Sequence, residues 1–203
     1  MKICFVAWSD FGIGGVPRVL TCLMDALSRK HDVSLYSLKN LPQSGIQGIN
    51  REQIHIYCRE MNLYEKIRRS AADVLVCKTP LFSSALGCRL YAAARYTSGF
   101  KKALTNHLNE HQYDVVIFGS GFEDSLLLAL TKNKLLPSMR ILTWSHASYD
   151  NYFTNMGSFF SRYMKEAIKA YYHRFDEIIV LSDGDEKEFR EKHHLPARRI
   201  YNP

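Results

Sequence analysis

Short apolar runs alternate with segments of helical periodicity along the chain, and this alternation limits the possible folds more than any other feature of the sequence. The first pair shows the pattern. Lys2–Trp8 is a nearly continuous apolar run, and from Val16 to Leu27 apolar residues recur every three or four positions, as on one face of a helix. Strands that are apolar without interruption are typical of parallel sheets with both faces covered. The sequence therefore predicts an α/β fold.

The same pattern continues to the C-terminus. It predicts strands at 2–8, 32–38, 53–58, 73–77, 113–118, 140–144 and 177–181. It predicts helices at 16–27, 81–111 with a break near Gly99, 122–133, 158–173 and 183–192. Right-handed crossovers between parallel strands leave few topologies, of which the Rossmann-like doubly wound parallel sheet with helices on both faces is the natural one. Ligands of such a sheet bind beyond the carboxyl ends of its strands, so the loops to inspect are 9–15, 119–122, 145–151 and 182–185.

Length and composition agree with one folded unit. The 203 residues fit a single domain. No apolar stretch approaches the ~20 residues that a membrane-spanning helix needs. The five cysteines are odd in number and form no C-x-x-C pair. We therefore expect reduced, buried cysteines and a cytoplasmic protein, and neither a disulfide framework nor a zinc site.

The net charge of +7 points to anionic partners and is concentrated in one region. Residues 51–110 hold ten Lys and Arg against five Asp and Glu. Within the basic stretch 89–102, cationic residues alternate with aromatic ones: Arg89, Tyr91, Arg95, Tyr96, Phe100, Lys101 and Lys102. A solvated basic face explains this pattern, and so does a contact with an anionic membrane surface or a charged acceptor. Nucleic acid is disfavoured, because no RNA- or DNA-binding signature accompanies the charge.

A glycine-rich loop follows the first strand and reads Gly12-Ile-Gly14-Gly15-Val-Pro17-Arg18. Glycine lets a backbone approach a ligand closely, and the free N–H groups of the next helix favour an anion. The loop is thus a candidate diphosphate cradle, with a plain strand-to-helix turn as the alternative. Pro17 stands where the dinucleotide fingerprint G-x-G-x-x-G has its third glycine, which disfavours an NAD-dependent oxidoreductase.

Four stretches in register resemble one family. Gly14–Leu20, with its helix and the strand at 31–36, resembles the opening of retaining GT-B glycosyltransferases of family 4. Tyr113–Phe118, Thr143–His146 and Phe175–Ser182 are similar to later strands of that family, in the same order. The resemblance spans nearly the whole chain. It implies one half of a GT-B fold and a transferase that takes a sugar from a nucleotide-sugar donor, without a metal or other cofactor.

The resemblance also implies roles for individual residues. Gly14 and Gly15 would approach the donor diphosphate, with Arg18 adding positive charge. His146 would contact the transferred sugar or the acceptor and is the candidate catalytic residue. The implied acceptor-binding residues are Gly119, Ser120, Gly121, Phe122 and Tyr149.

The family's second Rossmann-like domain, which binds the nucleotide sugar and carries a Glu-x7-Glu motif, has no counterpart in this sequence. We therefore expect residues 1–203 to form a single N-terminal, acceptor-side domain that is inactive alone. The expected acceptor of the whole enzyme is a cell-surface polysaccharide or glycolipid, with the enzyme at the inner face of the cell membrane. A stand-alone flavodoxin-like module that binds a small phosphorylated ligand at Gly14 and Gly15 remains the alternative.

Overall fold

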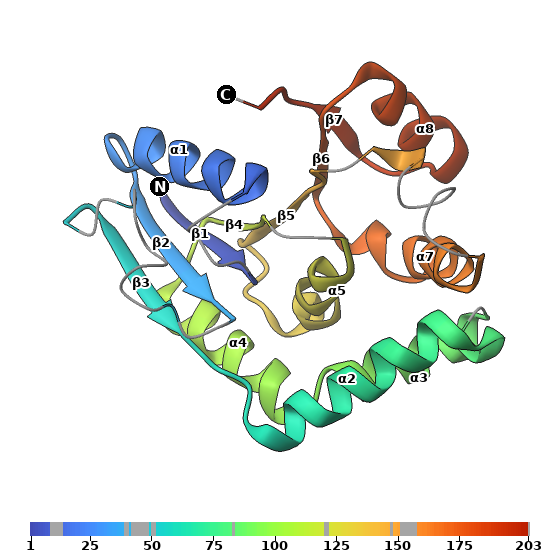
Figure 1. Cartoon of the computed structure of the whole chain (residues 1–203). Coiled ribbons are helices and arrows are strands. Elements are labelled where there is room, and N and C mark those ends of the chain that lie inside the picture. Colours follow the sequence, from blue (N-terminus) through green and yellow to red (C-terminus); the bar gives the residue numbers. More distant parts are fainter. Residues whose placement is uncertain are drawn as a thin grey trace.

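A seven-stranded, all-parallel sheet forms the centre of the protein (Figure 1). The computed structural model describes residues 1–8, 14–38, 41, 49, 52–82, 84–119, 122–146, 148–150 and 158–202. The strands are β1 (Lys2–Ala7), β2 (Asp32–Ser37), β3 (Ile54–Cys58), β4 (Val115–Phe118), β5 (Arg140–Trp144), β6 (Glu177–Val180) and β7 (Ala197–Arg199). Their order, β3-β2-β1-β4-β5-β6-β7, confirms the predicted doubly wound, Rossmann-like sheet.

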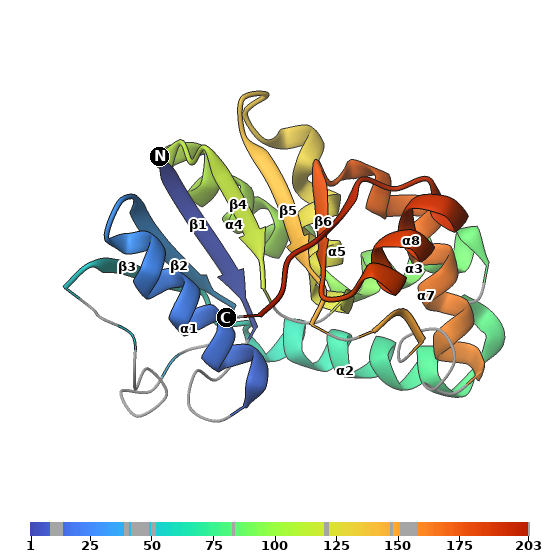
Figure 2. The same ribbon diagram turned by 90° about the horizontal axis from the view of Figure 1, so that it is seen from above.

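Helices cover both faces of this sheet (Figure 2). They are α1 (Gly15–Ser28), α2 (Leu63–Lys78), α3 (Ala85–Arg95), α4 (Ser98–His111), α5 (Phe122–Thr131), α7 (Ser158–Tyr171) and α8 (Asp183–His193). The side chains of alternate residues of β1 lie on opposite faces of the sheet, as expected for a strand. Phe5 packs in one core cluster with Leu20 and Met24 of α1, whereas Val6 lies in the other cluster with residues of α4, α5 and α7.

Residues 73–77 form no strand, and this prediction was wrong. They are the last turns of α2, in which Val76 is buried and Val74 and Leu75 are exposed. The run DVLVC has the composition of a buried strand, but the capping box of Asn62 and Glu65 starts a helix that continues through it. The helical region 81–111 is broken at Tyr96 and Thr97, two residues before Gly99, as predicted, and Thr97 caps α4. Strand β7 was not predicted.

Burial corrects two further expectations. Cys4 and Cys88 are buried, but Cys22, Cys58 and Cys77 are exposed. The basic stretch 89–102 does not present an aromatic and basic surface. Its aromatic residues and one of its arginines are in the core, because α3 and α4 turn them toward the sheet: Tyr91, Arg95, Tyr96 and Phe100. Within the described residues, no helix has both the length and the apolarity to cross a bilayer.

The chain reverses its direction of winding between β1 and β4, which are neighbours in the sheet. Both strands are parallel to β5 and β6, so the carboxyl ends of these strands meet at one edge. In doubly wound sheets, ligands bind in the crevice at this reversal. The start of α1, Gly119 and His146 follow these strand ends, which makes this edge the place to look for a site.

Candidate functional site

The N-terminus of α1 is open toward solvent. Gly14 precedes the helix with φ 137° and ψ 161°, a conformation nearly restricted to glycine, and a Cβ there would lie 3.3 Å from Cδ of Pro17. Gly15 differs, because a Cβ on it would meet nothing within 4 Å. The first turn carries no side-chain cap and no acidic residue. The positive end of the helix is therefore available to an anion, and the exposed Arg18 lies one turn further on.

Gly119, at the end of β4, packs directly under α1. Its N–H donates to the carbonyl oxygen of Val6 on β1 at 3.1 Å. A Cβ on Gly119 would lie only 2.4 Å from Cδ2 of Leu20, a fully buried residue of α1. The absence of a side chain at Gly119 thus sets how closely the end of β4 approaches the helix whose N-terminus is open.

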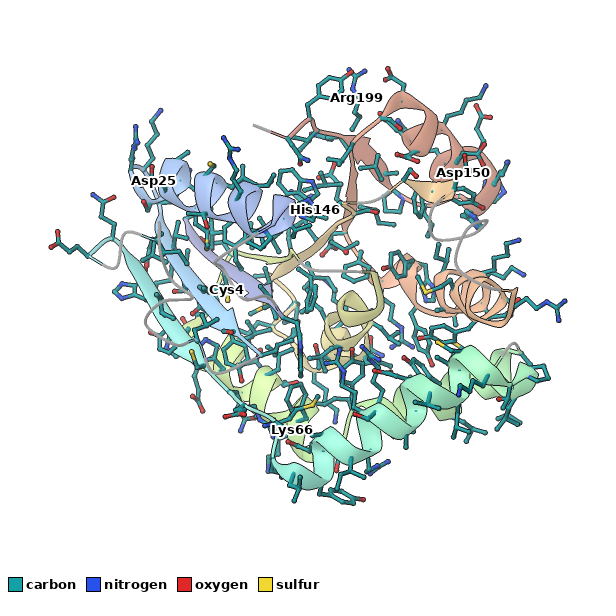
Figure 3. All side chains as sticks on the ribbon, in the orientation of Figure 1. Cys4, Asp25, Lys66, His146, Asp150 and Arg199 are labelled. Atoms are coloured by element: carbon teal, nitrogen blue, oxygen red, sulfur yellow. The ribbon has the colours of Figure 1, made fainter. Side chains whose placement is uncertain are left out.

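His146 stands just beyond β5 at the same edge (Figure 3). Its ring is parallel to that of Trp144, with centroids 5.7 Å apart. Both ring nitrogens are buried. Neither makes a hydrogen bond of normal geometry with a described residue, although the backbone of Gly119 lies close enough to affect the ring. Burial lowers the pKa of His146 to about 4, against a smaller opposite effect of the Gly119 backbone. At neutral pH the ring is uncharged, so one nitrogen donates and the other accepts.

Two buried polar atoms without partners need an explanation, since leaving such groups unsatisfied is costly. The indole Nε1 of Trp144 is a third buried polar atom without a partner in the described part of the chain. Trp144 is a core residue, as expected, but its position two residues before His146 places both rings on one side of an extended backbone. Only a polar group that reaches these buried atoms would satisfy them.

The remaining predicted residues lie elsewhere or outside the described part. Ser120 and Gly121 are outside the described residues, and Phe122 begins α5. Tyr149 is held by α8: its N–H donates to Oδ1 of Asp185 at 2.8 Å, and its hydroxyl lies 2.9 Å from Nε2 of His193. The structure therefore brings Gly119 and His146 together, while the described contacts of Tyr149 are with another helix. An acceptor-binding role for these residues stays a prediction.

A residue of α2 also borders this edge, although its sequence context indicated only a cluster of basic residues. The guanidinium of Arg69 lies 3.8 Å from the ring centroid of Trp8, which directly follows β1. Among the described ranges, no three His, Cys, Asp or Glu side chains gather as metal ligands would.

Comparisons with known proteins agree with this fold. The family model Glycosyltransferase Family 4 matches residues 13–203. Similar solved structures include the apo form of lipopolysaccharide outer core galactosyltransferase WaaB (14% identity, TM-score 0.59). They also include Anabaena Alr3699/HepE in complex with UDP and glucose (14% identity, TM-score 0.61). The alignments cover all of this chain, which spans 46% and 44% of those two chains. A search of the curated proteins found no match. Because the family model spans nearly the whole sequence, the chain belongs to glycosyltransferase family 4.

Proposed function

We propose that this chain is the N-terminal, acceptor-side domain of a two-domain hexosyltransferase. The enzyme would take a sugar from a nucleotide-sugar donor and transfer it to a cell-surface polysaccharide or glycolipid at the cytoplasmic face of the cell membrane. The observation that carries the proposal is a pair of groups at one sheet edge. They are the start of α1, which has no side-chain cap in the described part of the chain, and the ring of His146, which has no hydrogen-bond partner of normal geometry there. Family membership and the similar length of one GT-B half support it.

The donor diphosphate would lie at the start of α1. Its negative charge matches the open positive end of the helix, and Gly15 leaves room for it next to the backbone. Arg18 would add positive charge from the next turn. Alr3699/HepE was solved with UDP and glucose, so a UDP-sugar is the first donor to test. We propose that no metal ion is needed, and that a chelator leaves the rate of transfer unchanged.

His146 would bind the sugar that is transferred. A neutral imidazole has one N–H donor and one acceptor nitrogen, which suits two hydroxyls of a sugar. Burial keeps the ring uncharged at neutral pH, so the ring orients the sugar without adding a positive charge next to the reacting carbon. The hydrogen bonds that the ring lacks in the described structure would then be made to substrate.

The test is sugar transfer and donor hydrolysis by the longer protein that we propose. Each UDP- and GDP-sugar is incubated with the protein, and free nucleotide and transferred sugar are measured. We expect His146→Ala to lower kcat by about 100-fold or more, the usual effect of losing one hydrogen-bond donor that acts on the reacting group. His55→Ala is the matched control, because His55 is an exposed histidine on β3. Turnover of no sugar nucleotide would contradict the proposal, as would equal turnover by His146→Ala and the wild type.

A further inference from the structure

The backbone on either side of His146 decides where its ring lies. The ring packs on Trp144, but its nitrogens make no hydrogen bond of normal geometry with a described residue. Before His146, the N–H of Ser145 donates to the carbonyl oxygen of Ile179 at 2.8 Å, so the pairing of β5 with β6 continues to the residue next to the ring. After His146 the chain has left the sheet, because β5 ends at Trp144. The position of the ring therefore depends also on what holds the residues that follow it.

Helix α8 holds the segment 148–150, which follows the ring in the chain (Figure 1). The backbone N–H of Tyr149 donates to Oδ1 of Asp185 at 2.8 Å. The Tyr149 ring packs edge-on against that of the buried Phe189, with centroids 5.6 Å apart, and its hydroxyl lies 2.9 Å from Nε2 of His193. The backbone, ring and hydroxyl of one residue thus all contact α8.

Asp185 makes the backbone bond of this set, and it is almost fully buried. The residue is 8% exposed, and a buried carboxylate is costly unless its oxygens are paired. Oδ2 accepts from the hydroxyl of Ser182 at 2.7 Å, and the N–H of Asp185 donates to the same hydroxyl at 3.1 Å. These contacts with Ser182 cap α8. The bond of Oδ1 to Tyr149 is not part of the cap and reaches a segment 36 residues earlier in the chain.

We propose that Asp185 is a positioning residue for His146: by binding the N–H of Tyr149, it holds the backbone after the ring and so keeps the ring at the carboxyl edge of the sheet. An ionised carboxylate suits this role, because its hydrogen bond to a backbone N–H is shorter and stronger than one between neutral groups. Asp185 acts through the backbone of another residue and is not a ligand of the donor or the acceptor. The inference rests on the proposed function only where a sugar is concerned, since the position of the ring can be measured without one.

Glu186, the next residue of α8, offers a matched control. It lies in the same acidic first turn, so its removal takes the same charge from the same end of the helix. Its carboxylate accepts from the N–H of Arg199 at 3.2 Å and pairs with Arg190 at 3.0 Å. Among the described contacts, Glu186 thus binds β7 and its own helix, whereas Asp185 binds the segment after His146.

The first test is a titration of the histidine rings of the 203-residue chain by NMR. Burial keeps the pKa of His146 at about 4 in the wild type, and its signal is identified by its absence from His146→Gln. Asp185→Ala should release the ring toward water and raise this pKa by about one pH unit or more, toward the value of 6.5 of an exposed histidine. Loss of the negative charge would by itself lower the pKa of a nearby histidine, so a rise reports movement of the ring.

Two variants separate positioning from a general loss of stability. Glu186→Ala should lower Tm as well, but it should leave the pKa of His146 at about 4. Asp185→Asn keeps an oxygen that accepts from the N–H of Tyr149, so it should restore the pKa of the wild type. Thermal melts check that each variant folds. Hydrogen exchange in the wild type tests the bond without any substitution, and the Tyr149 amide should exchange at least about tenfold more slowly than an unprotected amide.

The second test is sugar transfer by the longer protein. Asp185→Ala should lower kcat by about 10- to 100-fold, the effect of misplacing a reacting group by about 1 Å, and Asp185→Asn should recover most of the loss. Glu186→Ala should keep the kcat of the wild type. Added to His146→Ala, Asp185→Ala should lower kcat little further, because both changes remove the same contact with the sugar.

Four results would overturn the inference. One is a pKa of His146 that stays at about 4 in the folded Asp185→Ala chain. Another is an equal rise of that pKa in Glu186→Ala. The third is rapid exchange of the Tyr149 amide in the wild type. The fourth is a pair of kcat losses, from Asp185→Ala and His146→Ala, that multiply in the double variant. Turnover of no sugar nucleotide would contradict the proposed function instead, and the titration would still decide whether Asp185 positions the ring.

Discussion

Alanine substitutions at Gly14 and Gly15, the two adjacent glycines at the start of α1, should show which glycine is required for stability and which for ligand binding. Gly14 has φ 137° and ψ 161°, a region that costs other residues about 1–3 kcal/mol. A protein of this size loses roughly 2–4 °C in Tm per kcal/mol, so Gly14→Ala should lower Tm by about 2–12 °C. Gly15 is the first helical residue, and its Cβ would meet nothing within 4 Å. Gly15→Ala should therefore leave Tm unchanged or raise it slightly.

Gly15→Ala should weaken donor binding, although it leaves Tm unchanged or slightly higher. If a diphosphate oxygen accepts a hydrogen bond from the start of α1, a methyl group on Gly15 displaces it. A hydrogen bond to a charged group contributes about 1.5–3 kcal/mol, so its loss corresponds to about 10- to 150-fold in Kd. Gly15→Ala is thus expected to be a stable protein that binds donor poorly.

Thermal melts by circular dichroism and calorimetric titration of UDP into the longer protein measure the two effects. Gly99→Ala is the matched control, because Gly99 is an exposed glycine in the first turn of α4 and its nearest contact would be 4.0 Å away. Gly99→Ala should leave donor binding unchanged, and it should melt at a higher temperature than Gly14→Ala. The reasoning is refuted if Gly15→Ala binds UDP as tightly as Gly99→Ala does, or if Gly14→Ala melts no lower than Gly15→Ala.

Three further outcomes are expected. Gly119→Ala should cost about 1–3 kcal/mol of stability, because the new methyl overlaps Leu20, and combining it with Leu20→Ala should cost less than the sum of the two single changes in urea unfolding. Asp73→Ala should cost roughly 3–5 kcal/mol, because it leaves the charge of Arg95 buried, and Arg95→Met in the same chain should recover part of the loss in the urea midpoint. Burial lowers the pKa of His146 from 6.5 to about 4, so the folded state binds fewer protons than the unfolded chain between these values. The corresponding stability is fully present above about pH 6.5 and is lost as the pH falls toward 4. His146→Gln should therefore reduce the change of the urea midpoint with pH across that range.

The sheet could be predicted because its central strands are short, apolar segments in the sequence. Residues 3–7 and 115–118 are apolar without interruption, and both belong to neighbouring strands in the middle of the sheet. The start of α1 could also be predicted, since Gly14, Gly15 and Pro17 are typical of a turn from a strand into a helix. The carboxyl-edge position of His146 followed from the strand before it.

The part that could not be predicted is α2. Its C-terminal turns have the composition of a strand, and their helical state depends on a start signal, Asn62 with Glu65, a dozen residues earlier. Its inner contacts are long-range: Glu65 is bound by Thr97, and Asp73 by Arg95. Helical periodicity assigns apolar residues to the buried face of a helix, and the exposed Ile67 does not follow this rule. Burial of Tyr91 and Phe100 likewise came from tertiary packing that no local pattern shows.

The most direct test of the proposed site is a crystal structure of the longer protein with UDP or a UDP-sugar bound. The diphosphate is predicted within hydrogen-bond distance of the first N–H groups of α1, beside Gly14 and Gly15, with the sugar in contact with the ring of His146. A nucleotide bound without contact to either the start of α1 or His146 would contradict the account.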